Sequence, residues 1–294
     1  MFDAEAQARA SRAALKVIGF AGVSNASPLL LSCSRHVCIL LPDLSLVARI
    51  SPATAENVAV GTRELLVTRY LLEKGAPVVG PSEMMPSKPF IEDGLAITFW
   101  PHVAHVKAED DDDAALSAAA HAHRRVHDAL ADYPGELPLD SKKIEPCAAL
   151  LRDPSALPAL AAEDRIFLMR AYERLRGSLA SLSVRLSPIH GDAHMGNVFI
   201  TPIGPLWTDF EAICLGPTEW DVAGVPHLPA FPLLDAQLYE VMSDLRSLCV
   251  TVWCSVLAAD RDKRAAAEYH LSRLRNERAG RAKTRPLPSR AAPR

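Results

Sequence analysis

Residues 187–200 read SPIHGDAHMGNVFI, and residues 206–211 read LWTDFE. Each stretch carries a short apolar run, and the intervening Pro202-Ile203-Gly204-Pro205 has the composition of a tight turn. Two apolar runs around such a turn predict a small β-hairpin with arms at residues 198–200 and 206–208. This hairpin determines where the polar residues beside it lie.

The polar residues at the open end of the hairpin have the character of a magnesium site. Asn197 precedes the first arm and Asp209 follows the second, so we expect both side chains to project from the same end. Mg²⁺ prefers oxygen ligands and keeps several waters, so a carboxylate, an amide oxygen and substrate phosphates suffice. Asp192 lies in a glycine-containing loop just before the hairpin, from which it could accept a proton from an attacking hydroxyl. These are the parts that phosphoryl transfer requires.

The combined pattern resembles a known family. His-Gly-Asp-x-His-x-x-Asn, followed by a strand ending in x-Asp-Phe-Glu, is the signature of the aminoglycoside phosphotransferase and choline kinase-like small-molecule kinases, which are relatives of protein kinases. Residues 190–197 and 208–211 match it, and residues 216–223, GPTEWDVA, are similar to the family's G-P-x-x-x-D-L-A segment. The resemblance implies an ATP-dependent phosphotransferase that moves the γ-phosphate to a hydroxyl of a small molecule, with ATP and Mg²⁺ as cofactors.

The resemblance also implies a role for each matched residue. Asp192 is expected to be the catalytic base that orients the acceptor hydroxyl. Asn197 and Asp209 are expected to hold Mg²⁺ against the phosphates of ATP. His194 stands where protein kinases have a catalytic-loop lysine, so we expect it to contact the transferring phosphoryl group.

Three further residues in the matched region are expected to have supporting roles. His190 and Asp221 are interpreted as supports of the catalytic loop, with Asp221 accepting hydrogen bonds from loop backbone. Glu211 is either a further acid near the metal or a structural replacement for glycine. The acceptor pocket is expected in the helices after Asp221, where nothing in the sequence identifies the acceptor.

The fold that the resemblance implies is α+β and two-lobed, like that of protein kinases. The predicted lobes are a small β-rich N-terminal nucleotide-binding lobe over residues 1–100 and a larger, mainly helical C-terminal catalytic and acceptor-binding lobe over residues 101–278. Residues 279–294 hold five basic residues, three prolines and no acidic ones, which predicts a disordered tail.

The first hundred residues have the mixed α and β pattern that this fold needs. Short apolar runs bounded by turn residues predict strands, and a longer periodic run that stops at Gly75 predicts a helix. After an N-terminal helix, the predicted elements are strands over residues 36–40, 45–50, 76–79 and 95–100, a turn at 41–44 and a helix over 53–74.

A kinase needs a strand-borne cation paired to a helix carboxylate. Arg49 ends one predicted strand, and Glu64 interrupts the apolar stripe of the predicted helix, a position where an unpaired charge is costly. We therefore predict that Arg49 and Glu64 pair.

The remaining nucleotide contacts are assigned by position. Residues 100–103 follow the last predicted strand of the first half and would form the hinge whose backbone meets adenine. The loop that covers the phosphates is expected between residues 22 and 34, where Ser and Asn replace a G-x-G-x-x-G pattern. The nucleotide-binding residues predicted here are Ser24, Asn25, Trp100, His102 and Val103.

The second half of the chain reads as helical. An alanine-rich segment and two runs of apolar residues at three- and four-residue spacing predict three helices. These lie over residues 114–131, from about 168 to 184, and over 238–256; the acidic run at residues 109–113 is interpreted as a solvated helix start or loop.

Composition excludes several other classes of protein. A formal net charge of −3 argues against nucleic acid as a partner, and no run reaches the roughly 20 apolar residues of a membrane helix. The N-terminus lacks a secretory pattern, and six scattered cysteines without a C-x-x-C pair are expected to be reduced and mostly buried. These features predict a cytoplasmic protein, and the partner that the resemblance implies is a small hydroxylated molecule.

Two alternatives stay open at this level. His190, Asp192 and His194 could form a metal-hydrolase ligand cluster, although the neighbouring glycines favour a loop over the extended strand that this needs. A catalytically weak, kinase-like nucleotide-binding protein is the other alternative. The histidines outside the motif suggest no ligand set and are interpreted as surface or packing residues: His102, His105, His121, His123 and His127.

Overall fold

The computed structural model describes residues 4–20, 27–33, 35–106, 112–139 and 144–281. The chain divides into two compact units, which are described separately below. One contains the residues up to Pro138 together with Leu186–Leu233, and the other contains Leu139–Arg185 and the residues from Leu234 onward. The lobe boundary near residue 100 stays a prediction.

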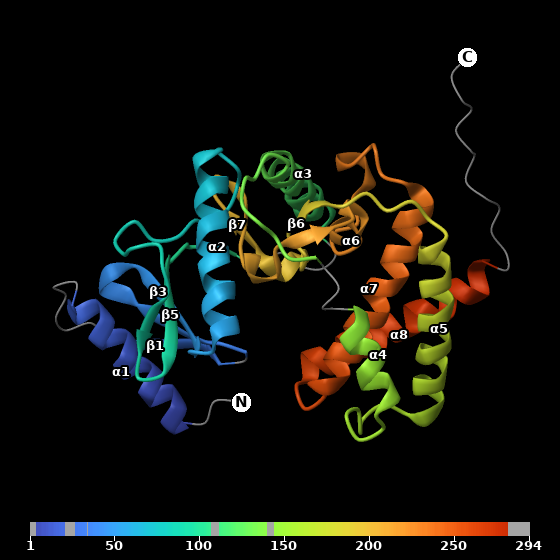
Figure 1. Ribbon diagram of the computed structural model, residues 1–294, viewed down its shortest axis with the longest axis horizontal. Helices are drawn as coiled ribbons and strands as arrows, with labels where there is room; N and C mark the ends of the chain where they lie inside the picture. The colour runs from blue at the N-terminus through green and yellow to red at the C-terminus, as the bar shows by residue number, and fades with distance from the viewer. Residues whose placement is uncertain (1–3, 21–26, 34, 107–111, 140–143, 282–294) are drawn as a thin grey trace, which may run out of the picture. The chain divides into compact units, whose positions relative to one another are not determined.

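The first unit contains a five-stranded antiparallel sheet with strand order β1-β2-β3-β5-β4 (Figure 1). Alternate residues of a strand point to opposite faces of a sheet. On β3, Ala48 and Ile50 therefore join the core that α1 (Ala4–Phe20) covers, while Arg49 between them faces the other side. The strands are β1 (Leu29–Cys33), β2 (Val37–Leu41), β3 (Leu46–Pro52), β4 (Phe90–Glu92) and β5 (Leu95–Pro101).

Helix α2 (Ala55–Glu73) packs against β5 and confirms the long helix predicted here. Thr54 caps its N-terminus by accepting from the backbone N–H of Asn57 at 3.1 Å. The helix stops just before Gly75, whose φ of +70° is a conformation that glycine adopts without strain. Glu64 lies on the buried face of α2 with only 1% of its surface exposed.

The rest of the first unit lies around two short antiparallel pairs. Strands β6 (Ser187–Ile189) and β9 (Cys214–Gly216) pair, and β7 (Val198–Thr201) with β8 (Gly204–Trp207) forms the predicted hairpin. Helix α3 contacts β6 and β8. The remaining elements are α3 (Asp113–Leu130), α6 (Thr218–Val222) and short 3-10 helices at Met195–Asn197, Phe210–Ala212 and Leu228–Ala230.

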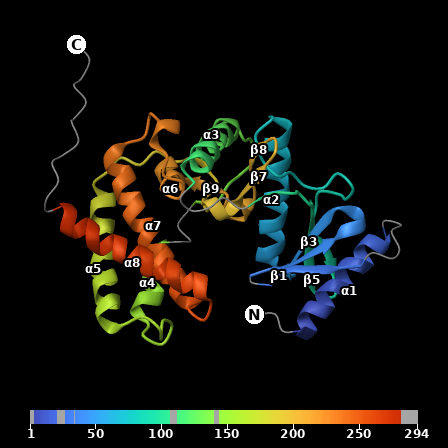
Figure 2. The same ribbon diagram turned by 180° about the vertical axis from the view of Figure 1, so that it is seen from behind.

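The second unit is helical in its described part. Helix α7 contacts the other three helices, and in Figures 1 and 2 α5 and α8 lie beside it. The predicted apolar seam of α7 is confirmed from Leu238 to Val252, whereas Val256 is 44% exposed. The helices are α4 (Ile144–Arg152), α5 (Ala162–Ala180), α7 (Ala236–Val256) and α8 (Arg261–Arg281).

Several predicted elements need correction. Residues 76–79 do not form a strand: Val78 makes one isolated bridge to Trp207, and Pro77 has no N–H with which to extend the pairing. The turn at 41–44 contains a 3-10 helix over Pro42–Leu44. The helix predicted to reach residue 184 ends at Ala180.

The loop expected over residues 22–34 contains a strand that was not predicted. Leu29–Cys33 forms β1 because this apolar run pairs with β2, and Arg35 and His36 are the described residues between the two strands. Ser24, Asn25 and Ser34 lie outside the described residues, as do 107–111 of the acidic region and 282–294 of the tail. Residues 279–281 belong to α8.

Two compositional expectations can be compared with the structure. All six cysteines are free, and three of them, Cys147, Cys214 and Cys249, are buried. Among the helices of the described ranges, none combines the length and apolar character that crossing a membrane requires.

Candidate active site

The loop between β6 and β7 is held by a fully buried imidazole. His190 Nε2 donates to the backbone oxygen of Thr208 at 2.9 Å, and its Nδ1 accepts from the backbone N–H of Asp192 at 3.3 Å. Burial lowers the pKa of His190, so the neutral form that can make both contacts is favoured. The ring therefore fixes the backbone beside Asp192, and neither of its nitrogens is positioned as the metal ligand that a hydrolase site would need.

Gly191 is required by the geometry of this loop. Its φ is +80°, and a Cβ atom there would lie 2.1 Å from the backbone oxygen of Ala212. Trp220 donates from Nε1 to the Gly191 carbonyl at 3.0 Å. A side chain at position 191 would both strain the backbone and clash with the chain that follows Asp209.

Asp221 supports the same loop from α6. Its carboxylate accepts the backbone N–H of His190 at 2.7 Å and that of Gly191 at 2.9 Å, which confirms the predicted contact with loop backbone. Burial acts to raise the pKa of Asp221, but the imidazoles of His123 and His127 lower it well below the usual value. The buried carboxylate is thus held in its ionised, hydrogen-bond-accepting form.

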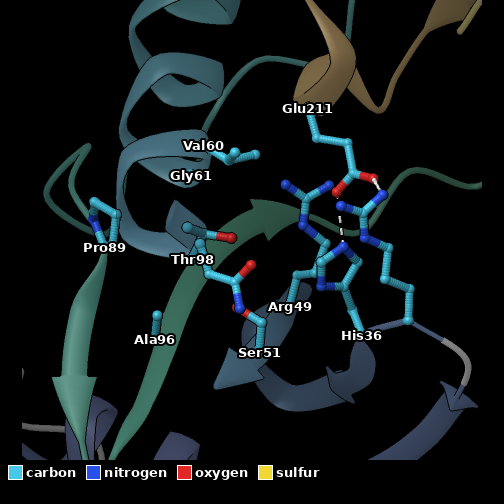
Figure 3. A pocket seen from close by; sticks show the side chains of 11 residues that line it. His36, Arg49, Ser51, Val60, Gly61, Pro89, Ala96, Thr98 and Glu211 are labelled. Carbon is cyan, nitrogen blue, oxygen red and sulfur yellow. Dashed lines mark hydrogen bonds and ion pairs between the residues drawn. The ribbon is translucent and has the colours of Figure 1, made fainter. Parts of the chain in front are cut away.

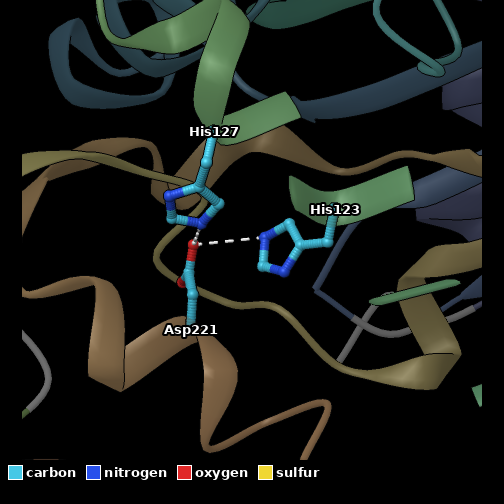
Figure 4. A group of neighbouring side chains, drawn as sticks. All are labelled: His123, His127 and Asp221. Atoms are coloured by element: carbon cyan, nitrogen blue, oxygen red, sulfur yellow. Dashed lines mark hydrogen bonds and ion pairs between the residues drawn. The ribbon is translucent and has the colours of Figure 1, made fainter. Parts of the chain in front are cut away.

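His123 and His127 were missed as partners of this loop by sequence reasoning. They lie one turn apart on α3, and Figure 4 shows both rings turned toward Asp221. His127 Nε2 donates to Asp221 at 3.0 Å, and His123 Nε2 lies 3.4 Å from the same oxygen. The three residues place metal-ligand atoms within 4.8 Å of one another. Because both Asp221 oxygens already accept loop N–H groups, we interpret the cluster as a support.

Asn197 connects the loop to the β7–β8 hairpin. Its Nδ2 donates to the backbone oxygen of Asp192 at 2.9 Å, and its own backbone oxygen accepts from Thr208 at 3.0 Å. The side-chain oxygen of Asn197 is thereby directed away from Asp192 as a potential ligand. Asp209, the residue after Thr208, has a left-handed backbone with φ of 63° and a side chain that is 40% exposed.

Arg49 joins the sheet to this hairpin. It forms an ion pair with Glu64 of α2, as predicted, and its Nη1 lies 3.1 Å from Asp209 Oδ1. Its guanidinium also lies 5.4 Å from the centre of the Trp100 ring. The structure therefore brings together a strand cation, a helix carboxylate and the predicted metal-binding aspartate.

The other predicted contact residues lie in and near the hinge and the loop. Trp100 is buried and donates to Thr98 at 3.0 Å, while His102 is exposed and its backbone N–H donates to Ser45 at 2.7 Å. The carbonyl of Val103 accepts from His105 Nδ1 at 2.8 Å. His194 is exposed, and its Nδ1 accepts from Gly196 at 3.0 Å.

A ring stack next to the hinge was also missed. His105 and Phe199 of β7 stack with centroids 3.8 Å apart and planes 10° from parallel. The apolar run of β7 predicted a strand, but no sequence signal places residue 105 beside residue 199. The stack connects the segment after β5 to the β7–β8 hairpin within the first unit.

A pocket lies between α2 and the strand face that carries Arg49 (Figure 3). His36 and Arg35, from the β1–β2 turn, each ion-pair with one oxygen of Glu211, at 2.7 and 2.9 Å. Burial acts to raise the pKa of Glu211, but the His36 hydrogen bond and the charge of Arg35 outweigh it and lower the pKa. Sequence reasoning missed Arg35 and His36 because the loop was expected before residue 34.

The donor atoms present fit a divalent cation that prefers oxygen. Asn197 offers an amide oxygen and Asp209 a half-exposed carboxylate, one on each side of the same hairpin. Neither sulfur nor imidazole lies among these two donors, which suits Mg²⁺ better than zinc. The site therefore matches the metal that the sequence resemblance implies.

An aspartate on a hydrogen-bonded glycine loop, oxygen donors at the hairpin that follows and a strand cation are the parts that a phosphotransferase of the protein-kinase-like class needs. The chain belongs to the phosphotransferase enzyme family, whose model matches residues 40–287. It is a small-molecule kinase, and its fold is the α+β, kinase-like fold predicted here.

Solved structures of low sequence identity share this fold. The GDP and kanamycin complex of APH(2")-IIia has a TM-score of 0.69 and 15% identity, covering 92% of this chain and 99% of that one. The microcompartment-associated aminopropanol kinase has a TM-score of 0.65 and 15% identity, covering 89% and 94%. A choline/ethanolamine kinase family protein from Mesorhizobium loti has a TM-score of 0.59 and 17% identity, covering 92% and 94%. A comparison with curated proteins found no match.

Proposed function

We propose that this chain transfers the γ-phosphate of ATP to a hydroxyl group of a small molecule. The observation that carries the proposal is the hydrogen-bonded frame around Asp192. Asp221 and His190 fix the backbone before it, and Asn197 binds its carbonyl. A carboxylate held in this way can orient an acceptor without a large loss of entropy at each turnover.

The chemical step is an in-line displacement at phosphorus. The acceptor oxygen forms a bond to the γ-phosphorus as the bond from that phosphorus to the β–γ bridging oxygen breaks, which leaves ADP. The Asp192 carboxylate accepts the proton of the acceptor hydroxyl. His194, on the exposed side of the loop, contacts the transferring phosphoryl group in this proposal.

Asn197 and Asp209 would hold Mg²⁺ at this site. When bound, the ion neutralises charge on the β- and γ-phosphates. Arg49 adds a fixed positive charge beside Asp209, and Glu64 holds the guanidinium in place. An arginine keeps its charge in such an environment, so it can serve where protein kinases use a strand lysine.

The nucleotide base belongs at the hinge in this proposal. Trp100 lies near the end of β5, and His102 and Val103 begin the segment that follows it; the backbone groups left unbonded in this segment would meet the edge of adenine. Ser24 and Asn25 remain proposed phosphate contacts. Since APH(2")-IIia was solved with GDP and an amicoumacin kinase with AMP-PNP, ATP and GTP should be compared directly.

The acceptor is expected to be a small hydroxylated molecule. The structural neighbours include complexes with kanamycin and spectinomycin as well as choline/ethanolamine-type and aminopropanol kinases. These names define a practical panel of aminoglycosides, related antibiotics and amino alcohols.

Acceptor-dependent release of ADP tests the proposal. Each member of the panel is incubated with the protein, Mg²⁺ and ATP or GTP, and the product is confirmed by a mass increase of one phosphoryl group. Asp192→Ala, purified in the same way, is the matched control, because its phosphorylation rate should be far below that of the wild type if the activity belongs to this site. ADP release that no hydroxylated compound stimulates would argue for the catalytically weak, nucleotide-binding alternative.

A further inference from the structure

The β1–β2 turn carries an arginine and a histidine in place of glycine. Its described residues are Arg35 and His36, and Cys33 precedes the turn at the end of β1. A glycine-rich turn binds phosphate through closely approaching backbone N–H groups. The sequence from Cys33 to His36 contains no glycine, so side chains must supply the positive charge if this turn contacts an anion.

Both side chains already bind an anionic group of the same chain. Arg35 Nη1 lies 2.9 Å from Glu211 Oε1, and His36 Nε2 lies 2.7 Å from Oε2 (Figure 3). The two oxygens of one carboxylate are thus bound by two neighbouring residues. This is the way in which two oxygens of a phosphate group would also be bound.

Glu211 lies immediately beside the proposed phosphate site. It follows Asp209 by two residues, and both Glu211 and Arg49 line the pocket that contains Arg35 and His36. Arg49 is itself matched to Asp209 and Glu64. The charge balance around this pocket therefore consists of Glu64 and Asp209 with Arg49, and of Glu211 with Arg35 and the hydrogen-bonded His36.

A bound nucleotide would change that balance. Its terminal phosphates bring more negative charge than one carboxylate, and arginine binds phosphate in a two-pronged geometry. The Arg35 side chain is 73% exposed, so solvent screens its pair with Glu211. His36 and Glu211 are only 19% and 14% exposed, so the phosphate contacts that the donors gain have to offset the loss of their contacts with Glu211.

We propose that Arg35 and His36 contact the terminal phosphates of the bound nucleotide, and that Glu211 occupies their donor atoms until the nucleotide binds. This inference rests on the proposed kinase function and adds residues to its nucleotide site. Glu211 therefore competes with phosphate for the donor atoms of Arg35 and His36. This gives a role to the acid at the position where protein kinases have a glycine.

The test compares the affinities of variants for Mg·ATP, for Mg·GTP and for the parent nucleosides. Arg35→Ala and His36→Ala should each weaken triphosphate binding about five- to tenfold, the effect of losing one charge-assisted contact. Glu211→Gln should strengthen it about threefold because it removes the competitor. Adenosine and guanosine, which lack phosphates, should bind all of these variants as they bind the wild type.

Two controls keep the result interpretable. Arg12→Ala removes an exposed cation from α1, on the opposite face of the sheet, and should leave binding unchanged. Arg35→Lys keeps the charge and should recover part of the affinity lost in Arg35→Ala. Circular dichroism and the Tm of each variant establish that it is folded.

The inference predicts that the Arg35 and His36 substitutions weaken triphosphate binding and that Glu211→Gln strengthens it. Unchanged triphosphate affinity in both Arg35→Ala and His36→Ala, or a loss of affinity in Glu211→Gln equal to theirs, would overturn the inference. If the wild type binds nucleotide and Asp209→Ala impairs that binding, the proposed function survives such a result. If the wild type binds neither Mg·ATP nor Mg·GTP, the proposed function fails as well.

Discussion

The backbone at Asp192 is fixed by hydrogen bonds to residues that have no proposed role in phosphoryl transfer. The fully buried Asp221 holds the two N–H groups before it, and the neutral ring of His190 accepts its own N–H. Because these contacts involve backbone, the loop keeps its shape when the Asp192 side chain is removed. The catalytic and the structural contributions of this loop can therefore be separated by mutation.

Asp192→Ala should strongly reduce phosphotransfer while leaving nucleotide affinity nearly unchanged. We expect the phosphotransfer rate to fall by about 10²–10⁴-fold, the range for loss of a general base, and the nucleotide Kd to change by less than about twofold. Single-turnover transfer to the identified acceptor and a separate nucleotide titration measure the two quantities. Equal turnover by wild type and variant would exclude Asp192 as the base.

Gly191→Ala should destabilise the first unit more than a comparable change elsewhere. Gly75 is the matched control, since its φ is +70° and a Cβ there meets nothing within 4 Å, whereas the Cβ at 191 would meet the Ala212 oxygen at 2.1 Å. Both variants carry a backbone cost of about 1–3 kcal/mol. Only Gly191→Ala adds a backbone clash, so urea unfolding should show the larger loss there; equal losses would contradict this account.

At the scale of elements, the site depends on β3 and α2 being fixed against the β7–β8 hairpin. Arg49 from β3 contacts both Glu64 of α2 and Asp209 after β8, and α2 also packs on the 3-10 helix that follows Asp209. A change on α2 should therefore be transmitted to the phosphate site through the orientation of Arg49.

Glu64→Gln should impair catalysis without removing the base. The neutral amide holds the guanidinium less firmly, and we expect kcat/KM for the nucleotide to fall about tenfold, which corresponds to about 1.4 kcal/mol. Glu73→Gln, at an exposed position of the same helix, should have no effect. Steady-state kinetics with varied nucleotide distinguish the two, and unchanged kinetics in Glu64→Gln would mean that the ion pair has no functional role.

Elements with a long periodic pattern were predictable, and short or polar ones were not. The apolar spacing of α7 and the cap and stop of α2 indicate helices locally, whereas β4 and β9 have three residues each and no pattern of their own. Helix α8 is largely polar, so it shows no apolar face in the sequence.

The contacts of the candidate site also include some that the sequence predicts and others that it does not. The residues from His190 to Asn197 form one contiguous motif, so their proximity follows from the sequence. The pair His36–Glu211 is separated by 175 residues, and His127–Asp221 by 94. Contacts of that range depend on the fold, and only an interrupted apolar stripe, as at Glu64, signals such a pair beforehand.

At the scale of the whole molecule, buried histidines make stability depend on pH. Burial lowers the pKa of His123 and of His270 to about 4, from about 6.5 in an exposed chain. Between pH 6.5 and pH 4 these histidines bind protons in the unfolded chain but not in the folded chain. The free energy of unfolding therefore decreases as the pH falls from about 6.5 toward 4. For the fully buried His123 the loss approaches about 3 kcal/mol.

His123→Phe should flatten this dependence. A phenyl ring can keep the stack on Trp207, whose centroid lies 4.2 Å away, and it has no proton to bind. Urea unfolding at pH 7 and pH 5 should show a smaller difference in the free energy of unfolding for this variant than for the wild type. His121→Phe, at an exposed position of the same helix, is the control, and an identical pH slope in all three proteins would refute the assignment to His123.

The central claim is that Asp209 and Asn197 form a metal-dependent phosphate site beside Asp192. The measurement that tests it most directly is nucleotide affinity with Mg²⁺ and with a chelator, in the wild type and in Asp209→Ala, with Asp43→Ala as an exposed control. The wild type and the control should bind at least about tenfold more tightly with Mg²⁺, and Asp209→Ala should lose that difference. Equal affinities with metal and with chelator in the wild type, or an unaltered metal dependence in Asp209→Ala, would contradict the claim.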